Sequence, residues 1–493
     1  MYRLYFKTNF FYSIILFLLL TMAGFNIFYN LGSFPIYSWD EARHGVNAYE
    51  MLRKGNFIVS TYRNEMDYWN LKPPLSFWAN IAGFKLAGYN PLGLRLFSAI
   101  SAMFTIIIIA IFVKIKHGKL ASLLSTLTLA TCTQFLINHS ARTGDADSLF
   151  VLLFTTAILS LLLFKKRLLW LYISALIFAL AFLTKSWHAG NIAIIIGLYL
   201  IFTKKYKILK WNNWTLFILC LLLPVLIWGG LRYQYDGIKF FKMMITYDLL
   251  QRSLTPIEGH LGGGIYYFNV LWRFFYLWLI FLCGIVFIFL YNGFFKQINT
   301  QDRDYILGMA LWVVIPILLF TLTKTKVRWY VLPVYPPISI IIGALASKII
   351  LNGKLPTKIA LLSSILFVCI YYEYEIQSYL NKPTPKLHLN LIQKIQDIDG
   401  MKGSTLFIHH RAGSELPQNI ILTAELYGDL HVADGDMIDF LRKDGALLLL
   451  KKGNGSEQII KSNHLMVVTA NKWGYIVRKN LYMGTPRNII KEK

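Results

Sequence analysis

The sequence predicts an all-α bundle that crosses a membrane about eleven times, followed by a smaller α/β region. Hydrophobic residues make up 56% of the 493 residues and charged residues only 15%, whereas a soluble chain has about 25% charged residues because its surface must be solvated. Apolar runs recur along most of the chain, and a helix needs roughly 20 apolar residues to cross a hydrocarbon layer. Such runs predict helices and not a barrel, because a helix pairs its backbone groups within its own segment.

Eleven apolar segments carry this prediction. They are Phe10–Asn30, Pro91–Val113, Leu120–Ile137, Ser148–Phe164, Leu168–Thr184, Gly190–Thr203, Trp214–Leu231, Val270–Tyr291, Tyr305–Leu322, Tyr330–Ile350 and Ile359–Ile370. The first segment lacks a small-residue cleavage site, so we interpret it as a retained helix and not as a signal peptide. With the N-terminus in the cytoplasm, an odd number of spans places the C-terminal tail outside.

The net charge of +25 would suit a nucleic-acid-binding protein, but its distribution favours a membrane protein. The tail from Lys382 contributes only +5 of this charge. Most of the remainder lies in short clusters at the ends of apolar runs, which is the positive-inside pattern of cytoplasmic loops. The clusters are Lys114, Lys116 and Lys119; Lys165, Lys166 and Arg167; and Lys204, Lys205, Lys207 and Lys210.

Three stretches interrupt the bundle. The first, residues 31–90, is far longer than a hairpin requires and contains amphipathic segments that suit short interfacial helices. The second, Arg232–Tyr267, contains three consecutive glycines at 262–264. The third is the tail, in which β-prone runs alternate with helix-like pieces. We therefore expect a transmembrane module over residues 1–380 and a soluble α/β domain over residues 381–493.

Two adjacent carboxylates, Asp40 and Glu41, follow the first span in the run Tyr37–Arg43. At a membrane surface, beside aromatic residues, such a pair suits a general base or a cation site. The alternative is a helix start, with Asp40 or Ser38 as the cap and Glu41 favoured by the helix dipole. The residue types alone leave both interpretations open.

Three further motifs fall on the same predicted side of the membrane. His139–Asp147 joins the third and fourth spans and places Asp147 at a membrane boundary, and Lys72 stands immediately before two prolines. Lys324–Tyr330 carries three cations in a short loop that the span count places outside, against the positive-inside trend. A lipid phosphate would compensate these cations. The alternative is a span count that is wrong by one.

With these motifs, the chain resembles the bacterial membrane glycosyltransferases of the GT-C fold, in the group of lipid A aminoarabinose transferases and protein O-mannosyltransferases. The resemblance covers about three quarters of the chain. Its features are Trp39-Asp40-Glu41, Lys72-Pro73-Pro74, Arg142 with Asp147, Lys324–Pro336 with Tyr330, Leu332 and Pro333 at its centre, and, more weakly, Arg252 followed by His260 and Tyr266-Tyr267. The bundle is shorter than in some aminoarabinose transferases, and glycines stand at 262–264 where those enzymes often have aromatic residues or proline.

The resemblance implies that a sugar leaves a polyprenyl phosphate outside the cytoplasm, with inversion at the anomeric carbon. A lipid phosphate is a good leaving group, so cations that hold its growing charge matter more than a general acid. One carboxylate must take the proton of the acceptor. The expected catalytic residues are Asp40 as the base, with Glu41 and Asp147 orienting the acceptor or sugar. The expected phosphate ligands are Lys72, Arg252, Lys326 and Arg328, and the expected positioning residues are Arg142, Asp145, His260 and Tyr330.

No organic cofactor is expected. Paired acids could hold a divalent cation, but no ligand spacing requires one, and the four cysteines all fall in apolar runs. The expected partners are the polyprenyl-phosphate sugar donor, membrane lipids and a glycan, lipid A or protein acceptor. The resemblance implies a multi-pass protein of the bacterial inner membrane, with a cytoplasmic N-terminus and an extracytoplasmic C-terminal domain.

A lipid or solute transporter, such as a flippase, is the competing interpretation. Transporters place ionisable residues near the middle of the membrane, in broken helices. In this sequence the notable charges lie at the outer ends of spans and in loops, which favours chemistry on a lipid headgroup. A purely structural membrane protein would leave these outer carboxylates and cations without a purpose. The sequence indicates neither the sugar nor the acceptor.

Overall fold

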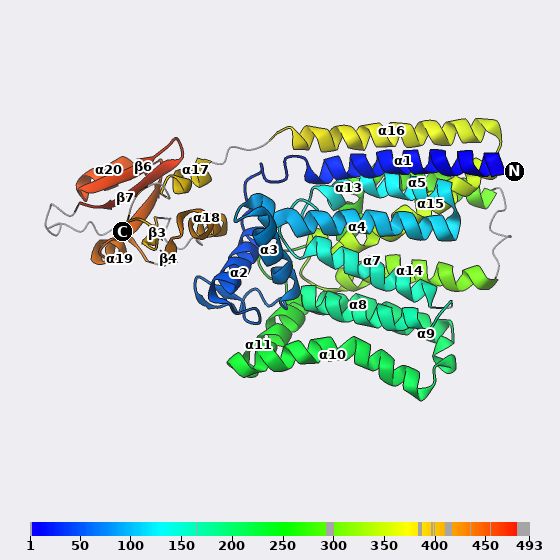
Figure 1. Ribbon diagram of the computed structural model, residues 1–493, viewed down its shortest axis with the longest axis horizontal. Helices are drawn as coiled ribbons and strands as arrows, with labels where there is room; N and C mark the ends of the chain where they lie inside the picture. Colours follow the sequence, from blue (N-terminus) through cyan, green and yellow to red (C-terminus); the bar gives the residue numbers. More distant parts are fainter. Residues whose placement is uncertain are drawn as a thin grey trace. The chain divides into compact units, whose positions relative to one another are not determined.

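The computed structural model is mostly helical (Figure 1). It describes residues 2–164, 166–291, 300–382, 387–395, 398, 400–409, 417–433, 435–453 and 455–480. Lys165, from one of the predicted basic clusters, lies outside these residues. The chain forms two compact units, and each is described by itself. The first comprises residues 1–31, 71–79 and 95–382, and the second comprises residues 32–70, 80–94 and 383–493.

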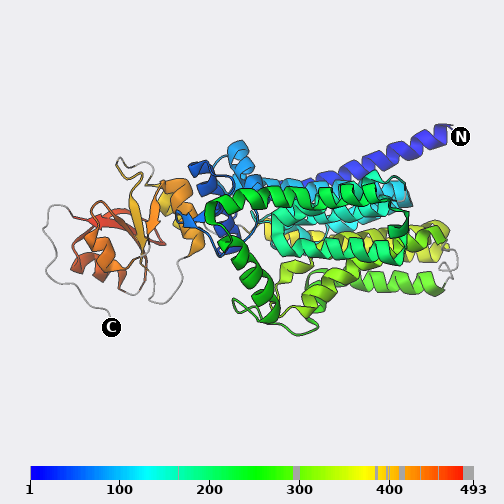
Figure 2. The same ribbon diagram turned by 90° about the horizontal axis from the view of Figure 1, so that it is seen from below.

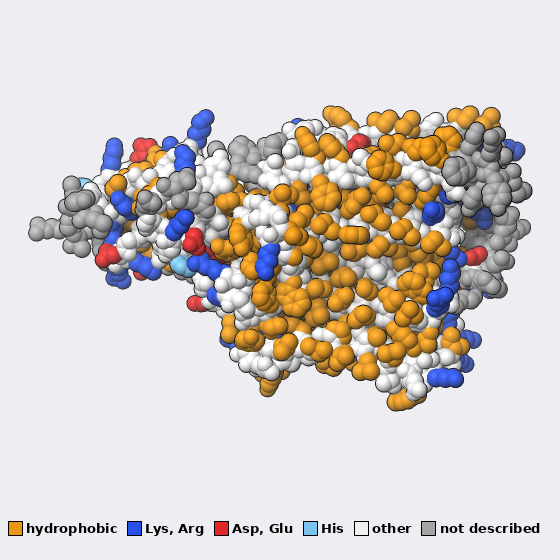
Figure 3. All heavy atoms as spheres, viewed as in Figure 1, with side chains coloured by type: hydrophobic (Ala, Val, Ile, Leu, Met, Phe, Trp, Pro, Cys, Tyr) orange, Lys and Arg blue, Asp and Glu red, His pale blue; other side chains and the backbone are white. Residues whose placement is uncertain are grey.

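Long helices build the first unit and lie roughly side by side in two perpendicular views (Figures 1 and 2). Within the described residues, eight helical stretches are long and apolar enough to cross a membrane. The helices concerned are α1 (Tyr2–Phe28), α4 (Pro91–His117), α8 (Leu169–Lys185) with α9 (Gly190–Phe202), α10 (Trp211–Asp236), α13 (Tyr266–Tyr291), α14 (Thr300–Leu322), α15 (Tyr335–Asn352) and α16 (Leu355–Leu380). Hydrophobic side chains cover much of the visible face of this unit (Figure 3), as expected for a surface in contact with lipid.

The count of eight differs from the eleven predicted segments for two reasons. First, α5 (Lys119–Ala130) and α7 (Asp147–Leu163) are apolar but shorter than 18 residues. Second, α8 and α9 are joined by the 3₁₀ turn η1 (Ser186–Ala189) and count as one stretch of 34 residues. Helices α7, α8 and α9 nevertheless each run along the length of the unit. The end of α8 lies at the start of α7, where Lys185 contacts Asp147, and Lys205, just past α9, lines the same cavity as Leu163 at the end of α7.

The tightest packing in this unit lies where α15 meets α5. A Cβ atom on Gly343 would stand 2.1 Å from Ser125 Oγ and 2.6 Å from the backbone oxygen of Ala121. Backbone atoms cannot move aside as a flexible side chain can, so only glycine fits there. Small residues at helix contacts are the usual way to bring helices together in lipid, where burial of apolar surface gives no driving force. This contact fixes α5, and α5 leads into the loop that carries the site.

The second unit combines the first long loop with the tail. Its elements are α2 (Asp40–Lys54), β1 (Thr61–Tyr62), β2 (Glu65–Met66), most of α3 (Leu75–Ala87), α17 (Leu387–Gln393), β3 (Thr405–Ile408), α18 (Gln418–Gly428), β4 (His431–Ala433), α19 (Met437–Arg442), β5 (Leu447–Lys451), α20 (Ser456–Ser462), β6 (Leu465–Ala470) and β7 (Gly474–Lys479). The five tail strands form one sheet in the order β4-β3-β5-β7-β6. Strand β3 is parallel to β4 and β5, whereas β7 is antiparallel to β5 and β6.

Helix α2 packs against α18 within this unit. A Cβ atom on Gly45 would stand only 2.5 Å from Leu422 Cδ2, so the two helices approach closely at this glycine. The short strand β4 has no counterpart among the β-prone runs of the sequence, but β3, β5, β6 and β7 overlap them. These runs are Thr405–His409, Ala446–Leu450, Leu465–Thr469 and Tyr475–Val477. The contact between α2 and α18 is a long-range pairing of the loop with the tail, which the linear division at residue 380 did not anticipate.

Candidate active site

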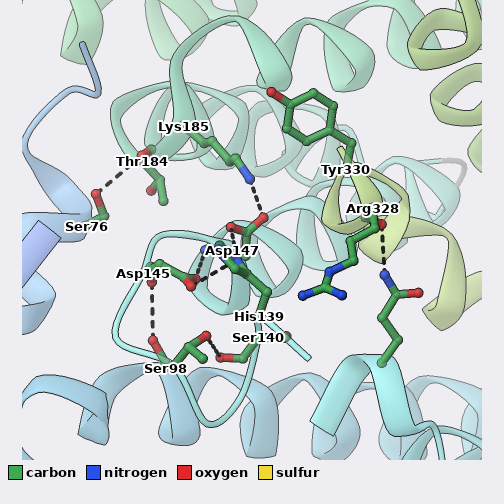
Figure 4. Close-up of polar contacts among 12 residues, drawn as sticks. Ser76, Ser98, His139, Ser140, Asp145, Asp147, Thr184, Lys185, Arg328 and Tyr330 are labelled. Atoms are coloured by element: carbon green, nitrogen blue, oxygen red, sulfur yellow. Dashed lines mark hydrogen bonds and ion pairs between the residues drawn. The ribbon is translucent and has the colours of Figure 1, made fainter. Parts of the chain in front are cut away.

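The loop between α5 and α7 brings one histidine and two aspartates together (Figure 4). His139 Nδ1 lies 3.0 Å from Asp145 Oδ2 and 3.4 Å from Asp147 Oδ2. The Lys185 ammonium, at the end of α8, forms an ion pair with Asp147 Oδ1. Both aspartates and Lys185 are buried. Asp147 is the first residue of α7, where the helix dipole stabilises a negative charge.

Helix α4 holds this loop in place. Ser98 Oγ donates to the backbone oxygen of Asp145 at 3.3 Å, and Ser148 Oγ donates to the backbone oxygen of Ser98 at 2.6 Å. The backbone N–H of Asp147 donates to Asp145 Oδ1 at 3.1 Å. The serine bonds therefore fix the backbone of the loop, and the backbone N–H of Asp147 fixes the carboxyl group of Asp145.

The carboxyl groups of Asp145 and Asp147 differ in their tendency to carry a negative charge. Burial raises the pKa of Asp145 to about 7, and the neighbouring Asp147 adds to this rise, while His139 opposes it.

One ligand atom from each of His139, Asp145 and Asp147 lies within 4.8 Å of the others. An imidazole with two carboxylates suits a divalent cation. Lys185 already provides a positive charge at Asp147, so a bound cation and Lys185 would share that carboxylate.

Three cations act on one histidine of the turn that follows Lys185. Lys72, Lys185 and Arg252 all interact electrostatically with His188, the third residue of η1. The Lys185 ammonium lies 5.5 Å from the centre of the Tyr330 ring, and Arg252 Nη1 donates to the Tyr330 hydroxyl at 3.2 Å. Lys185 and Arg252 thus contact Tyr330, and Lys72, from a third segment of the chain, acts with them on His188.

Asp248 orients one of these cations. It accepts a hydrogen bond from Ser186 Oγ at 2.9 Å and lies 3.3 Å from Arg252 Nε. Ser186 has φ +44°, an unusual value for a residue with a side chain, and it follows Lys185 directly. The turn at the end of α8 thus places Lys185 toward Asp147 and Ser186 toward Asp248.

An aromatic group forms one wall of the site. Trp329 stacks on His139 with ring centres 3.7 Å apart, and His260 meets Trp329 edge-on at 6.5 Å. Gln134 Nε2 donates to the backbone oxygen of Arg328 at 2.8 Å, which holds the start of the turn η5 (Arg328–Val334). In Figure 4 the Arg328 guanidinium points toward the space beside His139.

Lys326 differs from the expectation of a phosphate ligand. Its buried ammonium donates to the backbone oxygens of Phe320, Thr321 and Thr323, at the end of α14. An ammonium has three protons, and these three bonds use all of them. Lys326 therefore caps α14 and is no longer among the expected phosphate ligands.

Arg142 also has a structural position. Its Nη1 donates to the backbone oxygens of Asn26 and Ile27 at 3.0 and 2.8 Å. These carbonyls belong to the last turn of α1, which has no further turn to pair with them. Arg142 thus ties the site loop to the end of α1, consistent with a positioning role.

The remaining predicted residues, Asp40 and Glu41, lie in the second unit, at the start of α2. Glu41 is buried, and its Oε2 accepts a hydrogen bond from the backbone N–H of Tyr37 at 2.8 Å. Asp40 is half-buried. Trp39, just before the helix, has φ +68°. Glu41 therefore fixes the strained entry to α2, and Asp40 keeps a partly accessible carboxylate.

A buried ion pair supports this helix start. Arg43 binds Asp67 through two hydrogen bonds, of 2.7 Å from Nη2 and 3.0 Å from Nε, and its guanidinium lies over the rings of Tyr62 and Trp69. Burial alone would raise the pKa of Asp67, but the bonds from Arg43 and Asn47 outweigh burial and lower it. The pair holds the β1–β2 hairpin against α2 in the charged state.

Sequence reasoning missed Lys185, His188 and Asp248. Lys185 stands at the end of a predicted span, and an ionisable residue in an apolar segment is a signal of function in its own right. His139 opens the His139–Asp147 motif, but the residue types of that motif predict no role for it. Asp248 carried no such signal, because its importance arises only from Ser186 and Arg252.

Comparisons with known proteins agree with this architecture. Residues 71–228 match the family model described as dolichyl-phosphate-mannose-protein mannosyltransferase. An uncharacterised protein of Aquifex aeolicus is 29% identical over 335 residues, which cover 67% of this chain and 73% of that protein. The undecaprenyl phosphate-alpha-4-amino-4-deoxy-L-arabinose arabinosyl transferase of Shewanella sediminis is 25% identical over 323 residues, 64% of this chain. The match spans only 56% of that transferase.

A solved structure has the same fold over nearly the whole chain. The crystal structure of ArnT from Cupriavidus metallidurans bound to undecaprenyl phosphate superposes with a TM-score of 0.74 at 14% identity. The superposition covers 94% of this chain and 97% of that one. At this identity the likeness shows the fold alone.

Proposed function

Because the chain belongs to the GT-C-fold membrane glycosyltransferases, in the group of the aminoarabinose and protein O-mannosyl transferases, we propose that it moves a sugar from a polyprenyl phosphate to an acceptor outside the cytoplasm. The observation that carries this proposal is that Lys185 and Arg252 contact Tyr330 and act with Lys72 on His188, while Lys185 also pairs with Asp147. A site for a lipid-linked sugar needs cations for the phosphate and carboxylates for the hydroxyl groups.

The cations would hold the donor phosphate. Arg252 offers a planar fork of N–H groups, and Lys72 and Lys185 act as point charges. As the bond between the sugar and the phosphate oxygen breaks, the electron pair of that bond moves onto the phosphate. Cations already in place stabilise the developing charge more than they stabilise the bound donor, and this difference lowers the barrier. Arg328 is a fourth proposed ligand, and Lys326 is replaced by Lys185.

Asp40 is the proposed general base. It would take the proton of the acceptor hydroxyl while the hydroxyl oxygen forms the new bond to the anomeric carbon, opposite to the departing phosphate, so that the configuration inverts. Asp147 is less suited to this step because Lys185 neutralises it. Asp145 and Asp147 are proposed to orient the sugar, with Glu41, Arg142, His260 and Tyr330 as positioning residues.

A divalent cation is compatible with this proposal. His139, Asp145 and Asp147 would hold it, and it would add positive charge near the phosphate.

The proposed location is the bacterial inner membrane, with the N-terminus in the cytoplasm and the tail outside. The acceptor is proposed only as a class: a lipid, a polysaccharide or a protein.

Arg252→Gln tests the phosphate site. We expect turnover at saturating polyprenyl-phosphate sugar to fall at least about tenfold, because one lost cation costs about 1.4 kcal/mol or more of transition-state stabilisation. Purified protein is assayed for sugar transfer, and donor affinity is measured separately. Arg273→Gln, at an exposed cation on α13, is the matched control. Unchanged turnover in the Arg252 variant contradicts the proposal.

A further inference from the structure

We propose that the first unit binds one anionic phospholipid in a cavity remote from the site described above. The cavity has a volume of about 630 Å³, which is within the usual range for sites that hold a small ligand. It is lined by α4, α7, α8, α9 and α14 and by the segments that follow α7 and α9. No part of the proposed reaction uses it.

The walls of the cavity suit a hydrocarbon chain. They are formed by apolar residues such as Ile108, Phe112, Leu159 and Leu163. Ile111 and Ile115, also in the lining, are 54% and 66% exposed, although both belong to a helix long and apolar enough to span a membrane. In a bilayer this opening faces lipid and not water. An acyl chain is therefore the natural occupant of the apolar part.

Charged residues occupy one end of the cavity. Lys116 lies 3.4 Å from Asp302 and Lys205 lies 2.8 Å from Asp304, so these four charges are balanced in pairs. Lys166 also lines the cavity and is exposed, and we find no ion pair for it among the described residues. The lining thus carries one uncompensated positive charge. A phospholipid with one net negative charge would neutralise it, with its phosphate at Lys166 and its chain in the apolar part.

The position separates this lipid from the donor phosphate. Lys166 follows the end of α7, whereas Asp147 begins it. Seventeen helical residues span about 25 Å, so the two anion sites lie near opposite ends of α7. Trp170 also lines the cavity, and tryptophan favours the level of lipid headgroups. A phosphatidylglycerol headgroup between Trp170 and Lys166 would place Trp170 at the headgroup level and pair Lys166 with the lipid phosphate.

Native mass spectrometry of the full-length protein tests this inference. Delipidated protein in detergent is titrated with dioleoyl phosphatidylglycerol and, separately, with dioleoyl phosphatidylcholine, which has no net charge. We expect one phosphatidylglycerol to be retained preferentially. Lys166→Gln should reduce its retention about fivefold, the effect expected for one basic residue near a lipid phosphate. Lys210→Gln, at an exposed lysine outside the cavity, should leave retention unchanged.

A second variant tests the cavity itself. Ile108→Trp places a larger side chain at a half-buried position of the lining and should prevent retention. If that variant does not fold, Lys166→Gln still decides, because its exposed side chain supports no packing. Equal retention of the two lipids, or no effect of Lys166→Gln, overturns the proposal. Undiminished retention in a folded Ile108→Trp protein overturns it as well, because the lipid then binds elsewhere.

Discussion

A general base must be ionised and within reach of its substrate, and we propose this role for Asp40, which is half-buried at the first turn of α2. We expect Asp40→Asn to lower turnover by about 10²–10⁴-fold, the usual contribution of such a base, because the amide keeps the shape but cannot take a proton. Sugar transfer is measured with protein matched for yield and monodispersity. Glu65→Gln, at an exposed carboxylate of the same unit, should retain full activity. A variant at position 40 that keeps more than about a tenth of the rate would remove Asp40 from this role.

The residue types and motif order predicted much of the candidate site, but not the partners of each side chain. Lys326 and Lys185 illustrate the difference. In the sequence both are lysines close to the end of an apolar run, yet one caps α14 and the other pairs with Asp147. Only the directions of the neighbouring backbone carbonyls distinguish them. These directions depend on how the chain turns after each helix, which local sequence does not specify.

At the scale of elements, the close contact between α2 and α18 contains a buried carboxyl pair. Burial first, and then the nearby Glu50 carboxylate, raises the pKa of Glu425 well above its usual value, while Arg53 and Lys54 on α2 oppose the rise. Glu50 itself accepts bonds from the backbone N–H of Asn64. Glu425 is therefore favoured in its protonated form, in which it can donate to Glu50.

This pair makes the second unit sensitive to alkaline pH. A carboxyl whose pKa is raised by folding stabilises the fold fully at low pH and loses that contribution as the pH rises through its pKa. We expect the unfolding temperature to fall as the pH rises above the ordinary pKa range of a glutamate and through the raised pKa of Glu425. Glu425→Gln should reduce this fall because an amide does not titrate. Differential scanning fluorimetry measures both curves. Glu65→Gln should follow the wild type, and an unchanged slope in Glu425→Gln would show that another group titrates.

At the scale of the molecule, the basic clusters and the span count predict one orientation. The loop with Arg167 should lie in the cytoplasm and the tail with Lys461 outside, because cations concentrate in cytoplasmic loops. The test uses single cysteines at these two exposed positions, with the exposed native Cys283 replaced by serine. A membrane-impermeant thiol reagent applied to spheroplasts should label position 461 only. Labelling of position 167 alone would invert the topology and move Asp40 to the wrong side.

Apolar periodicity and length predicted a helical membrane bundle, and the structure and comparisons confirm it. The number of spans is less determined. The helix α7 is shorter than a full span, and α8 and α9 form one continuous apolar stretch. The chain reverses inside that stretch at Ser186–Ala189, between the two predicted segments Leu168–Thr184 and Gly190–Thr203, so the count depends on whether a stretch or a crossing is counted. The pairing of α2 with α18 was inaccessible from the sequence, because it joins segments more than 350 residues apart.

The convergence of Lys72, Lys185 and Arg252 has a consequence for the reaction cycle. On the proposed chemistry the donor is a phosphodiester with one negative charge, whereas the spent carrier is a monoester that approaches two near neutral pH. A cluster of fixed cations attracts the second species more strongly. The enzyme should therefore be inhibited by its own product, with added polyprenyl phosphate competing against the donor more effectively at pH 8 than at pH 5.5. Equal inhibition at the two pH values would contradict this expectation. If the product inhibits the enzyme in this way, the rate at which spent carrier is removed from the outer leaflet limits the rate of glycosylation in the cell.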